Sequence, residues 1–418
     1  MKRNALWTLA SLLLIAGLLV AGCRATSTPT AEPTKVVTEE PAKTEPPVAT
    51  TEAPAMAVEV TLWHSYHTGE NEEKAINQLI AQYQADHPEV TVNVLAVPFD
   101  QLFNKWETEV AAGGGPDMFT APNDNLGNEV RGGLVAPLDD LLAGKLDGYS
   151  ELGIAGVTVD GQMYAVPGIV KAVGLFYNKS LVDTPPATLD DLAAQVAGGT
   201  KYVLMQYGYH NFGFFTGAFG GTLMDDTGTC IADQGGFADA MQSLYDLKQA
   251  GLLFETDEGK ANTMFIQGEV AGIISGPWML GTFKDALGDN LGVAPMPAGP
   301  EGAATPLSGI DGWYINPNSQ YTEAAIDLAL YLFGQDGMAA YANVAGDPPA
   351  RTDVDITDPL VQAFADVGNA GFPRPQSVEF GNWWGPFGDA FTKVMEGQVS
   401  AADAVAQACA DMNTASGK

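Results

Sequence analysis

The sequence predicts an α/β protein with two lobes. Three observations lead to this prediction: strand, helix and strand alternate over residues 58–97, a second alternation begins at residue 173, and the chain has 418 residues. That length corresponds to two or three domains of ~100–200 residues each. Hydrophobic residues make up 46% of the chain, which is enough to fill two sizeable cores.

The first alternation covers residues 58–97. Hydrophobic and polar residues alternate over 58–62, as in a half-buried strand. Residues 70–86 predict an amphipathic helix, because their apolar members recur at the spacing of one helix face: Ile76, Leu79, Ile80 and Tyr83. His87-Pro88 ends this helix, and valines return over 90–97 as the next strand. A strand, a helix and a strand in this order form the βαβ unit of a mostly parallel sheet.

The second alternation extends to the end of the chain. Thr188 and Asp191 form a capping box, with Asp in place of the usual Glu, which predicts the start of a helix. Further strands are predicted at 173–177, 202–206, 270–275 and 309–315, and further helices at 237–249, 321–333, 358–367, 384–395 and 400–413.

The N-terminus predicts export. Lys2 and Arg3 precede an apolar stretch that is shorter than a membrane span and ends in Val20-Ala21-Gly22-Cys23. This ending resembles the bacterial lipobox, in which the cysteine becomes the lipidated first residue. The alternative is an ordinary signal whose cleavage site contains a cysteine. We expect a signal peptide over 1–22, lipidation at Cys23 and a disordered Thr- and Pro-rich stalk over 23–57.

The charge limits the partners. With 51 acidic and 19 basic residues the formal net charge is −32, so nucleic acid and anionic lipid headgroups are poor partners. Neutral or cationic small molecules fit better.

Motifs for cofactors or metals are not found. GxxxxGK[ST], HExxH and GxSxG do not occur, and the four histidines show no metal-ligand spacing with carboxylates. His64 and His67 could form a metal pair, but surface or hydrogen-bonding roles are the favoured interpretation. We expect no cofactor and no metal. Outside the signal, Cys230 and Cys409 form a disulfide or remain as two buried thiols.

The tryptophans suggest a ligand. Trp106 shares a helical stripe with Leu102 and Val110, which predicts a core position. The other five outside the signal lie at strand ends or in Gly- and Pro-bearing turns: Trp63, Trp278, Trp313, Trp383 and Trp384. Ligands of open α/β sheets bind beyond the carboxyl ends of strands, and aromatic rings beside amides and carboxylates suit a sugar. Alternatively, some of these rings fill the edges of the lobes.

Several motifs resemble one family. They are Gly115-Pro116-Asp117-Met118 with Asn123-Asp124, Leu175-Phe176-Tyr177-Asn178-Lys179 with Pro185-Pro186-Ala187-Thr188, Phe219-Gly220-Gly221, Gly276-Pro277-Trp278 and Ala294-Pro295-Met296-Pro297. In this order, over residues 58–413, the chain resembles the bacterial extracellular solute-binding proteins (family 1) of ABC sugar importers. Within this family, the chain resembles the maltose- and maltodextrin-binding proteins.

This resemblance implies a fold and a function. The fold is the two-lobed type II periplasmic-binding-protein fold, with a ligand cleft between lobes that hinge strands connect. The N-lobe comprises residues 58–169 plus 307–352, and the C-lobe 170–306 plus 353–418, which contains both cysteines and favours the disulfide. The implied function is that of a monomeric, non-enzymatic receptor on a lipid anchor, which binds an oligosaccharide of the maltodextrin kind and delivers it to a membrane permease.

The resemblance also implies binding residues. Trp278 and Trp384 match two aromatic platforms, Asp124 an acidic sugar ligand, and Ser65 to Thr68 a loop that touches sugar. Ala121, Lys171, Gly208 and His210 depart from the pattern. The full set of candidate binding residues is Trp63, Ser65, Tyr66, His67, Asn123, Asp124, Lys171, Tyr207, Trp278, Asp311, Trp313, Trp383 and Trp384.

Two other functions remain open. An exported glycoside hydrolase would use the same aromatic rings together with two carboxylates ~5–9.5 Å apart. A sensor module would pass ligand occupancy to a signalling partner.

Overall fold

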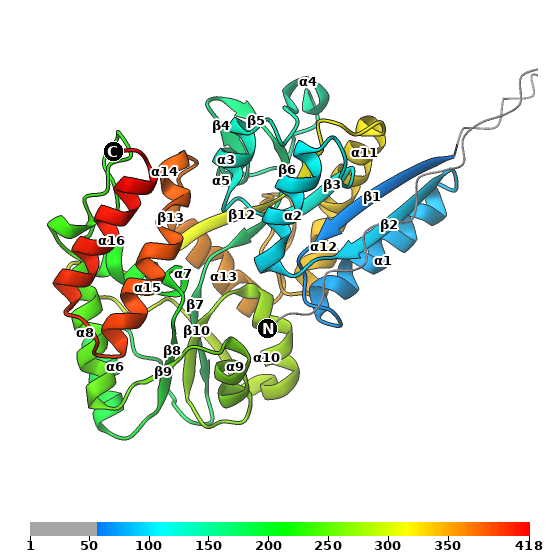
Figure 1. Ribbon diagram of the computed structural model, residues 1–418. Coiled ribbons are helices and arrows are strands. Elements are labelled where there is room, and N and C mark those ends of the chain that lie inside the picture. Colours follow the sequence, from blue (N-terminus) through cyan, green and yellow to red (C-terminus); the bar gives the residue numbers. More distant parts are fainter. Residues whose placement is uncertain (1–56) are drawn as a thin grey trace, which may run out of the picture. The chain divides into compact units, whose positions relative to one another are not determined.

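The computed structural model describes residues 57–418. The signal peptide, Cys23 and all but the last residue of the expected stalk lie outside the described residues. Two main sheets form the framework (Figure 1). The first has the strand order β13-β12-β3-β1-β2, and β6 also pairs with β12. Its strands are β1 (Val58–His64), β2 (Val90–Ala96), β3 (Met118–Pro122), β6 (Ala165–Lys171), β12 (Leu307–Ile315) and β13 (Phe372–Pro373).

The first sheet contains both parallel and antiparallel strand pairs. β1 runs parallel to β2 and β3, whereas β12 runs antiparallel to β3 and β6. The βαβ unit predicted from residues 58–97 is therefore confirmed. Every residue of β12 is buried, so its sequence lacks the alternation of hydrophobic and polar residues that is typical of a half-buried strand.

The second sheet has the order β11-β7-β10-β8-β9. β8 runs parallel to β9 and β10, and β7 runs antiparallel to β10 and β11. Its strands are β7 (Gly174–Asn178), β8 (Tyr202–Met205), β9 (Leu253–Glu255), β10 (Gly272–Ser275) and β11 (Leu291–Ala294), and a separate hairpin pairs β4 (Thr158–Val159) with β5 (Gln162–Met163).

Helices cover both sheets. Those before β7 are α1 (Asn71–Asp86), α2 (Phe99–Ala111), α3 (Leu126–Arg131), α4 (Asp139–Leu142) and α5 (Glu151–Gly156). Those between β7 and β12 are α6 (Leu189–Ala197), α7 (Gly208–Gly213), α8 (Phe237–Ala250), α9 (Glu258–Ile266) and α10 (Leu280–Leu287), with the short turns η1 (Phe214–Ala218), η2 (Ala232–Gln234), η3 (Pro277–Met279) and η4 (Gly288–Asn290). The last group comprises α11 (Thr322–Leu332), α12 (Gln335–Val344), α13 (Pro359–Asn369), α14 (Val378–Gly381), α15 (Trp384–Met395) and α16 (Ala401–Ala415).

Local sequence explains where these helices begin. The capping box that opens α6 is present: the backbone N–H of Asp191 donates to Thr188 Oγ1 over 3.1 Å, and the N–H of Thr188 donates to Asp191 Oδ2 over 3.0 Å. Ser400 caps α16 without a reciprocal backbone bond: its Oγ accepts the N–H of Asp403 over 3.2 Å. α16 packs against α15 and α8 beside the second sheet (Figure 1).

The buried residues form separate cores. One core draws on residues 60–170 and 310–350, and Trp106 is fully buried within it, as its helical stripe predicts. Two further cores draw on residues 173–307 with 380–412 and on residues 176–291 with 342–364. Cys230 and Cys409, whose Cα atoms lie 5.4 Å apart, form a disulfide between the start of η2 and α16. Within residues 57–418 no helix combines the length and apolar character that a bilayer span requires.

Candidate functional site

Aromatic side chains gather beyond one edge of the second sheet. β8 and β10 are parallel, so their carboxyl ends meet at the same edge. α7 begins shortly after β8 and brings Tyr209 and His210, while the turn Gly276-Pro277 follows β10 and brings Trp278. The rings of Tyr209 and Trp278 have centroids 6.1 Å apart, and those of Tyr209 and Trp384 6.4 Å apart. We call Tyr209, His210, Trp278 and Trp384 the aromatic cluster.

A buried charged cluster lies at the end of β6. Lys171 Nζ lies 2.5 Å from Glu72 Oε1, 2.9 Å from Asp347 Oδ1 and 3.6 Å from Asp311 Oδ2. All four side chains are buried. They come from β6, α1, β12 and the segment after α12, so the cluster forms only when distant parts of the chain meet. We call these four residues the charged cluster.

Burial controls the pKa values in the charged cluster. Burial raises the pKa of Asp311 to about 6 and that of Asp347 to about 7, against the attraction of Lys171. The carboxylates nevertheless raise the pKa of Lys171 well above its ordinary value and outweigh its own burial. The lysine is therefore charged at neutral pH. The negative charge of the two aspartates is balanced partly by this lysine and partly by protonation of their own carboxyl groups.

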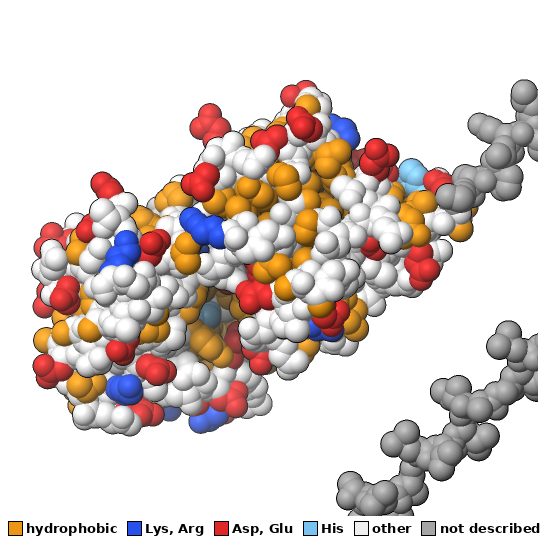
Figure 2. Space-filling model, turned by 45° about the horizontal axis from the view of Figure 1, so that its top comes forward, with side chains coloured by type: hydrophobic (Ala, Val, Ile, Leu, Met, Phe, Trp, Pro, Cys, Tyr) orange, Lys and Arg blue, Asp and Glu red, His pale blue; other side chains and the backbone are white. Residues whose placement is uncertain are grey.

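The two clusters adjoin. The hydroxyl of Tyr209 donates to the backbone carbonyl of Lys171 over 3.1 Å. The guanidinium of Arg374 lies 5.3 Å from the Tyr209 ring centroid and 5.8 Å from that of Trp384, and it forms an ion pair with Asp124. Figure 2 shows a hollow in the molecular surface with hydrophobic side chains and a histidine inside it and acidic side chains beside it.

Several buried polar atoms in these clusters and in the loop after β1 have no hydrogen-bond partner within the described residues. They are Asp311 Oδ1, Asp347 Oδ2, the Tyr66 hydroxyl and both ring nitrogens of His210. Leaving one such group unpaired costs about 1–3 kcal/mol. Burial also lowers the pKa of His210 to about 3, so its imidazole is neutral and has one donor and one acceptor. The arrangement suits a ligand with many hydroxyl groups.

The three candidate residues in the loop after β1 differ in how far they are buried. Tyr66 is buried and stacks on His64 with ring centroids 5.2 Å apart, and its pKa is raised by burial and by the nearby Tyr341, Asp311 and Glu72. Ser65 is half-buried and His67 is exposed. Burial raises the pKa of Glu258 at the start of α9, and the nearby His67 partly opposes this shift. His64 is hydrogen-bonded, because its Nδ1 accepts the N–H of Tyr66 over 3.2 Å.

Four of the predicted residues lie in the cores instead. Trp63 packs edge-on against Trp106 at 6.5 Å, and Trp313 and Trp383 are fully buried. Asn123 donates to Gly156 O and accepts from Ile310 N, which commits its amide to the backbone. The local sequence around these residues does not specify which face each side chain occupies, and all four side chains are buried. We therefore leave these four residues out of the site.

Among the remaining candidates, Asp124, Lys171, Asp311, Trp278 and Trp384 belong to the two clusters or contact them. Tyr207 is 38% exposed and lies 5.4 Å from His210, ring centroid to ring centroid. The sequence did not single out Arg374, Glu72 and Asp347. Glu72 resembled an ordinary acidic residue in the first turn of a helix, and nothing local distinguishes Arg374. Within residues 57–418 no group of three or more His, Cys, Asp or Glu side chains is placed to hold a metal ion.

Comparison with known proteins identifies the family. The model of the bacterial extracellular solute-binding proteins matches residues 78–369, which is more than half of the chain. The chain belongs to this family. Among curated relatives, the solute-binding protein is 24% identical to a maltotriose-binding protein of Pyrococcus abyssi over 83% of its own length and 80% of the relative's. It is 26% identical to a galactooligosaccharide-binding protein of Bacillus subtilis, over 81% and 86% of the two chains.

Solved structures agree with the fold. The maltotriose-binding protein of Thermus thermophilus, bound with maltotriose, superposes with a TM-score of 0.77 at 27% identity, covering 85% of this chain and 99% of that one. The GacH receptor of Streptomyces glaucescens superposes with a TM-score of 0.81 at 22% identity, covering 86% and 98%. The solute-binding protein therefore has the two-lobed type II periplasmic-binding-protein fold that the motifs imply.

Proposed function

We propose that this solute-binding protein is a sugar receptor of an ABC importer, which binds an oligosaccharide of the maltodextrin kind without transforming it. The observation that carries the proposal is the contact between the aromatic cluster and the charged cluster. The rings can stack on the C–H faces of pyranose units. The unpartnered atoms of Asp311, Asp347 and His210 can bond hydroxyl groups.

The relatives support the same ligand class. The curated relatives named above bind maltotriose and galactooligosaccharide, and both are binding proteins rather than enzymes. We infer that Trp278, Trp384 and Tyr209 stack on the sugar, and that Asp124, with Arg374, and His210 bond its hydroxyl groups. Ala121 and Lys171 depart from the maltodextrin pattern, so the preferred sugar can differ from maltotriose, and a titration with two trisaccharides distinguishes the possibilities.

We propose further that the two lobes comprise residues 58–169 plus 307–352 and residues 170–306 plus 353–418. The aromatic cluster would then belong to the C-lobe and most of the charged cluster to the N-lobe. A ligand that contacts both lobes stabilises the closed form, because only that form presents both sets of groups at once. The closed complex is what a permease would recognise.

We also infer how the receptor is held. A signal peptide over residues 1–22, lipidation at Cys23 and the stalk that follows would tether a monomer to the membrane near its permease, either within a periplasm or on the outer face of the cell membrane. Lipidation is checked by mass spectrometry of the protein expressed in a bacterial host. The mass of a diacylated Cys23 supports the tether, and an unmodified N-terminus at another residue contradicts it.

A fluorescence titration tests the sugar site. Purified protein is titrated with maltotriose and with galactotriose while tryptophan emission is recorded. Trp278→Ala should weaken binding of the preferred sugar by about 5- to 150-fold, which corresponds to ~1–3 kcal/mol for one stacking ring. Tyr321→Ala is the matched control, because Tyr321 is exposed at the start of α11. Equal affinities for the two variants would contradict the assigned platform.

A further inference from the structure

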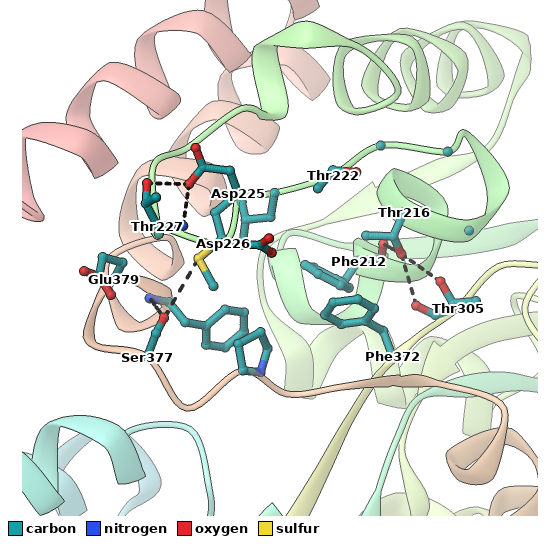
Figure 3. A pocket seen from close by; sticks show the side chains of 18 residues that line it. Phe212, Thr216, Thr222, Asp225, Asp226, Thr227, Thr305, Phe372, Ser377 and Glu379 are labelled. Atoms are coloured by element: carbon teal, nitrogen blue, oxygen red, sulfur yellow. Dashed lines mark hydrogen bonds between the residues drawn. The ribbon is translucent and has the colours of Figure 1, made fainter. Parts of the chain in front are cut away.

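A second pocket, with a volume of about 710 Å³, lies between the loop after η1 and the segment that contains β13 and α14. Its walls come from residues 212–228, Thr305 and residues 372–380 (Figure 3). No member of the charged cluster or the aromatic cluster lines it. The volume lies within the range of ~300–1,000 Å³ that is usual for small-molecule sites.

One wall of this pocket is aromatic. Phe212, Phe372 and Phe380 line it, and the rings of Phe212 and Phe372 have centroids 5.8 Å apart. Phe212 and Phe380 are buried, but Phe372 is 42% exposed. An exposed phenylalanine ring beside two buried ones provides a flat apolar surface that a ligand can cover.

The other walls are polar, and their hydroxyls are held in place. Thr216 Oγ1 lies 2.9 Å from Thr305 Oγ1 and donates to the carbonyl of Phe212 over 3.0 Å. Asp225 Oδ1 accepts the N–H groups of Thr227 and Thr229 and so fixes the turn at the rim. Figure 3 shows the carboxylate of Asp226 directed into the pocket.

The charge of the lining selects against anions. Asp225, Asp226 and Glu379 line the pocket, and no lysine or arginine does. Lys418 lies at this rim, but its ammonium already pairs with Glu379 over 3.6 Å and donates to the carbonyl of Thr227. A phosphate or carboxylate ligand would therefore meet a lining of net negative charge. An uncharged ligand with both apolar faces and hydroxyl groups matches the aromatic wall, the threonine hydroxyls and the Asp226 carboxylate together.

The pocket shares a wall with the site described above. Phe212 packs on Trp383 at 5.1 Å, and Phe380 packs on Trp384 at 5.7 Å. Along the segment 372–380, Arg374 faces Tyr209 and Trp384, whereas Phe372 faces Phe212. The same short segment therefore serves both sites.

We propose that this pocket is a second saccharide site, which takes an uncharged saccharide through Phe372, Phe380 and the Asp226 carboxylate. The choice of a saccharide rests in part on the proposed function, since both sites would draw on the same sugar. The pocket itself is independent of that proposal, because no residue of the two clusters lines it.

Isothermal titration calorimetry of the purified protein with maltotriose and with galactotriose tests the inference. Two variants separate the sites. Thr222→Trp fills the pocket from an exposed lining position, and Trp278→Ala weakens the first site. Thr91→Trp on β2 is the control for adding a tryptophan at an exposed threonine. Thermal unfolding of each variant checks that the fold is kept, and Phe372→Ala provides a second variant at an exposed position.

We expect two saturable binding events in the wild type. Thr222→Trp and Phe372→Ala should remove one event or weaken it at least fivefold, and Trp278→Ala should weaken the other. A single event that only Trp278→Ala weakens overturns the second site and leaves the proposed function intact. A single event that only the pocket variants weaken overturns the first site and supports the second. The absence of any event overturns both.

Discussion

Replacing Lys171 by methionine should destabilise the protein in a pH-dependent way. At an effective dielectric of about 20, each of the three carboxylates within 3.6 Å of Lys171 Nζ contributes several kcal/mol of attraction. Desolvation and the repulsion between the carboxylates offset most of this. Removing the single cation from such a buried group costs about 3–5 kcal/mol, so the free energy of unfolding of Lys171→Met should fall by that amount at pH 8.

The pH dependence follows from the direction of the pKa shifts. The pKa of Lys171 is raised, so its contribution is present throughout pH 5–8 and is lost only at higher pH, as the pH rises through that raised value. The pKa values of Asp311 and Asp347 are also raised, to about 6 and about 7, so the folded state holds protons that the unfolded chain has released. These two groups therefore lower stability as pH rises from about 4 through 7. Without Lys171 the pKa values of Asp311 and Asp347 rise further. The stability lost in Lys171→Met should therefore be largest above pH 7 and smaller at pH 5.

Urea denaturation at pH 5 and pH 8 measures this effect. Lys284→Met is the matched control, because Lys284 is exposed and pairs with Asp358 at the surface, where such a pair contributes less than about 1 kcal/mol. If Lys171→Met loses no more stability than Lys284→Met, or loses the same at both pH values, the buried charged cluster is not formed as described.

Two further predictions concern the disulfide and His210. Replacing Cys230 and Cys409 together by serine opens a loop of 179 residues that the disulfide closes. The chain-entropy model gives a loss of about 5 kcal/mol in the free energy of unfolding. A urea midpoint equal to that of the wild type under non-reducing conditions would contradict this prediction. His210→Phe removes two unpartnered ring nitrogens from a buried site, so thermal stability should be kept or increased while affinity for the sugar falls, and an unchanged affinity would show that the imidazole does not touch the ligand.

Most of the framework could be predicted from local patterns. The βαβ unit at 58–97 follows from the change in hydrophobic period from two to 3.6 residues, and the start of α6 follows from the capping box at Thr188. α12 was not predicted, because its glycine and small residues give a weak helical signal at Gln335–Val344. α9 and α10 were not predicted either; they have only nine and eight residues, which is too short for a periodic pattern to stand out beside the neighbouring turns.

The site was predictable only in part. Trp278 and Trp384 stand at turns whose sequence marks them, and both are half-buried in the aromatic cluster. Trp313 occupies a similar turn in the sequence but lies in a strand that is buried on both faces. The charged cluster joins residues 72, 171, 311 and 347, which no local pattern connects. Long-range packing decides both outcomes.

The central claim is that the protein binds an uncharged oligosaccharide and leaves it intact. The most direct measurement incubates the purified protein with an excess of maltotriose or galactotriose, follows binding by calorimetry, and then analyses the recovered sugar by chromatography. The account predicts saturable binding of at least one of these sugars, with the trisaccharide recovered unchanged. Recovery of shorter sugars, or no heat of binding with either trisaccharide, would contradict it.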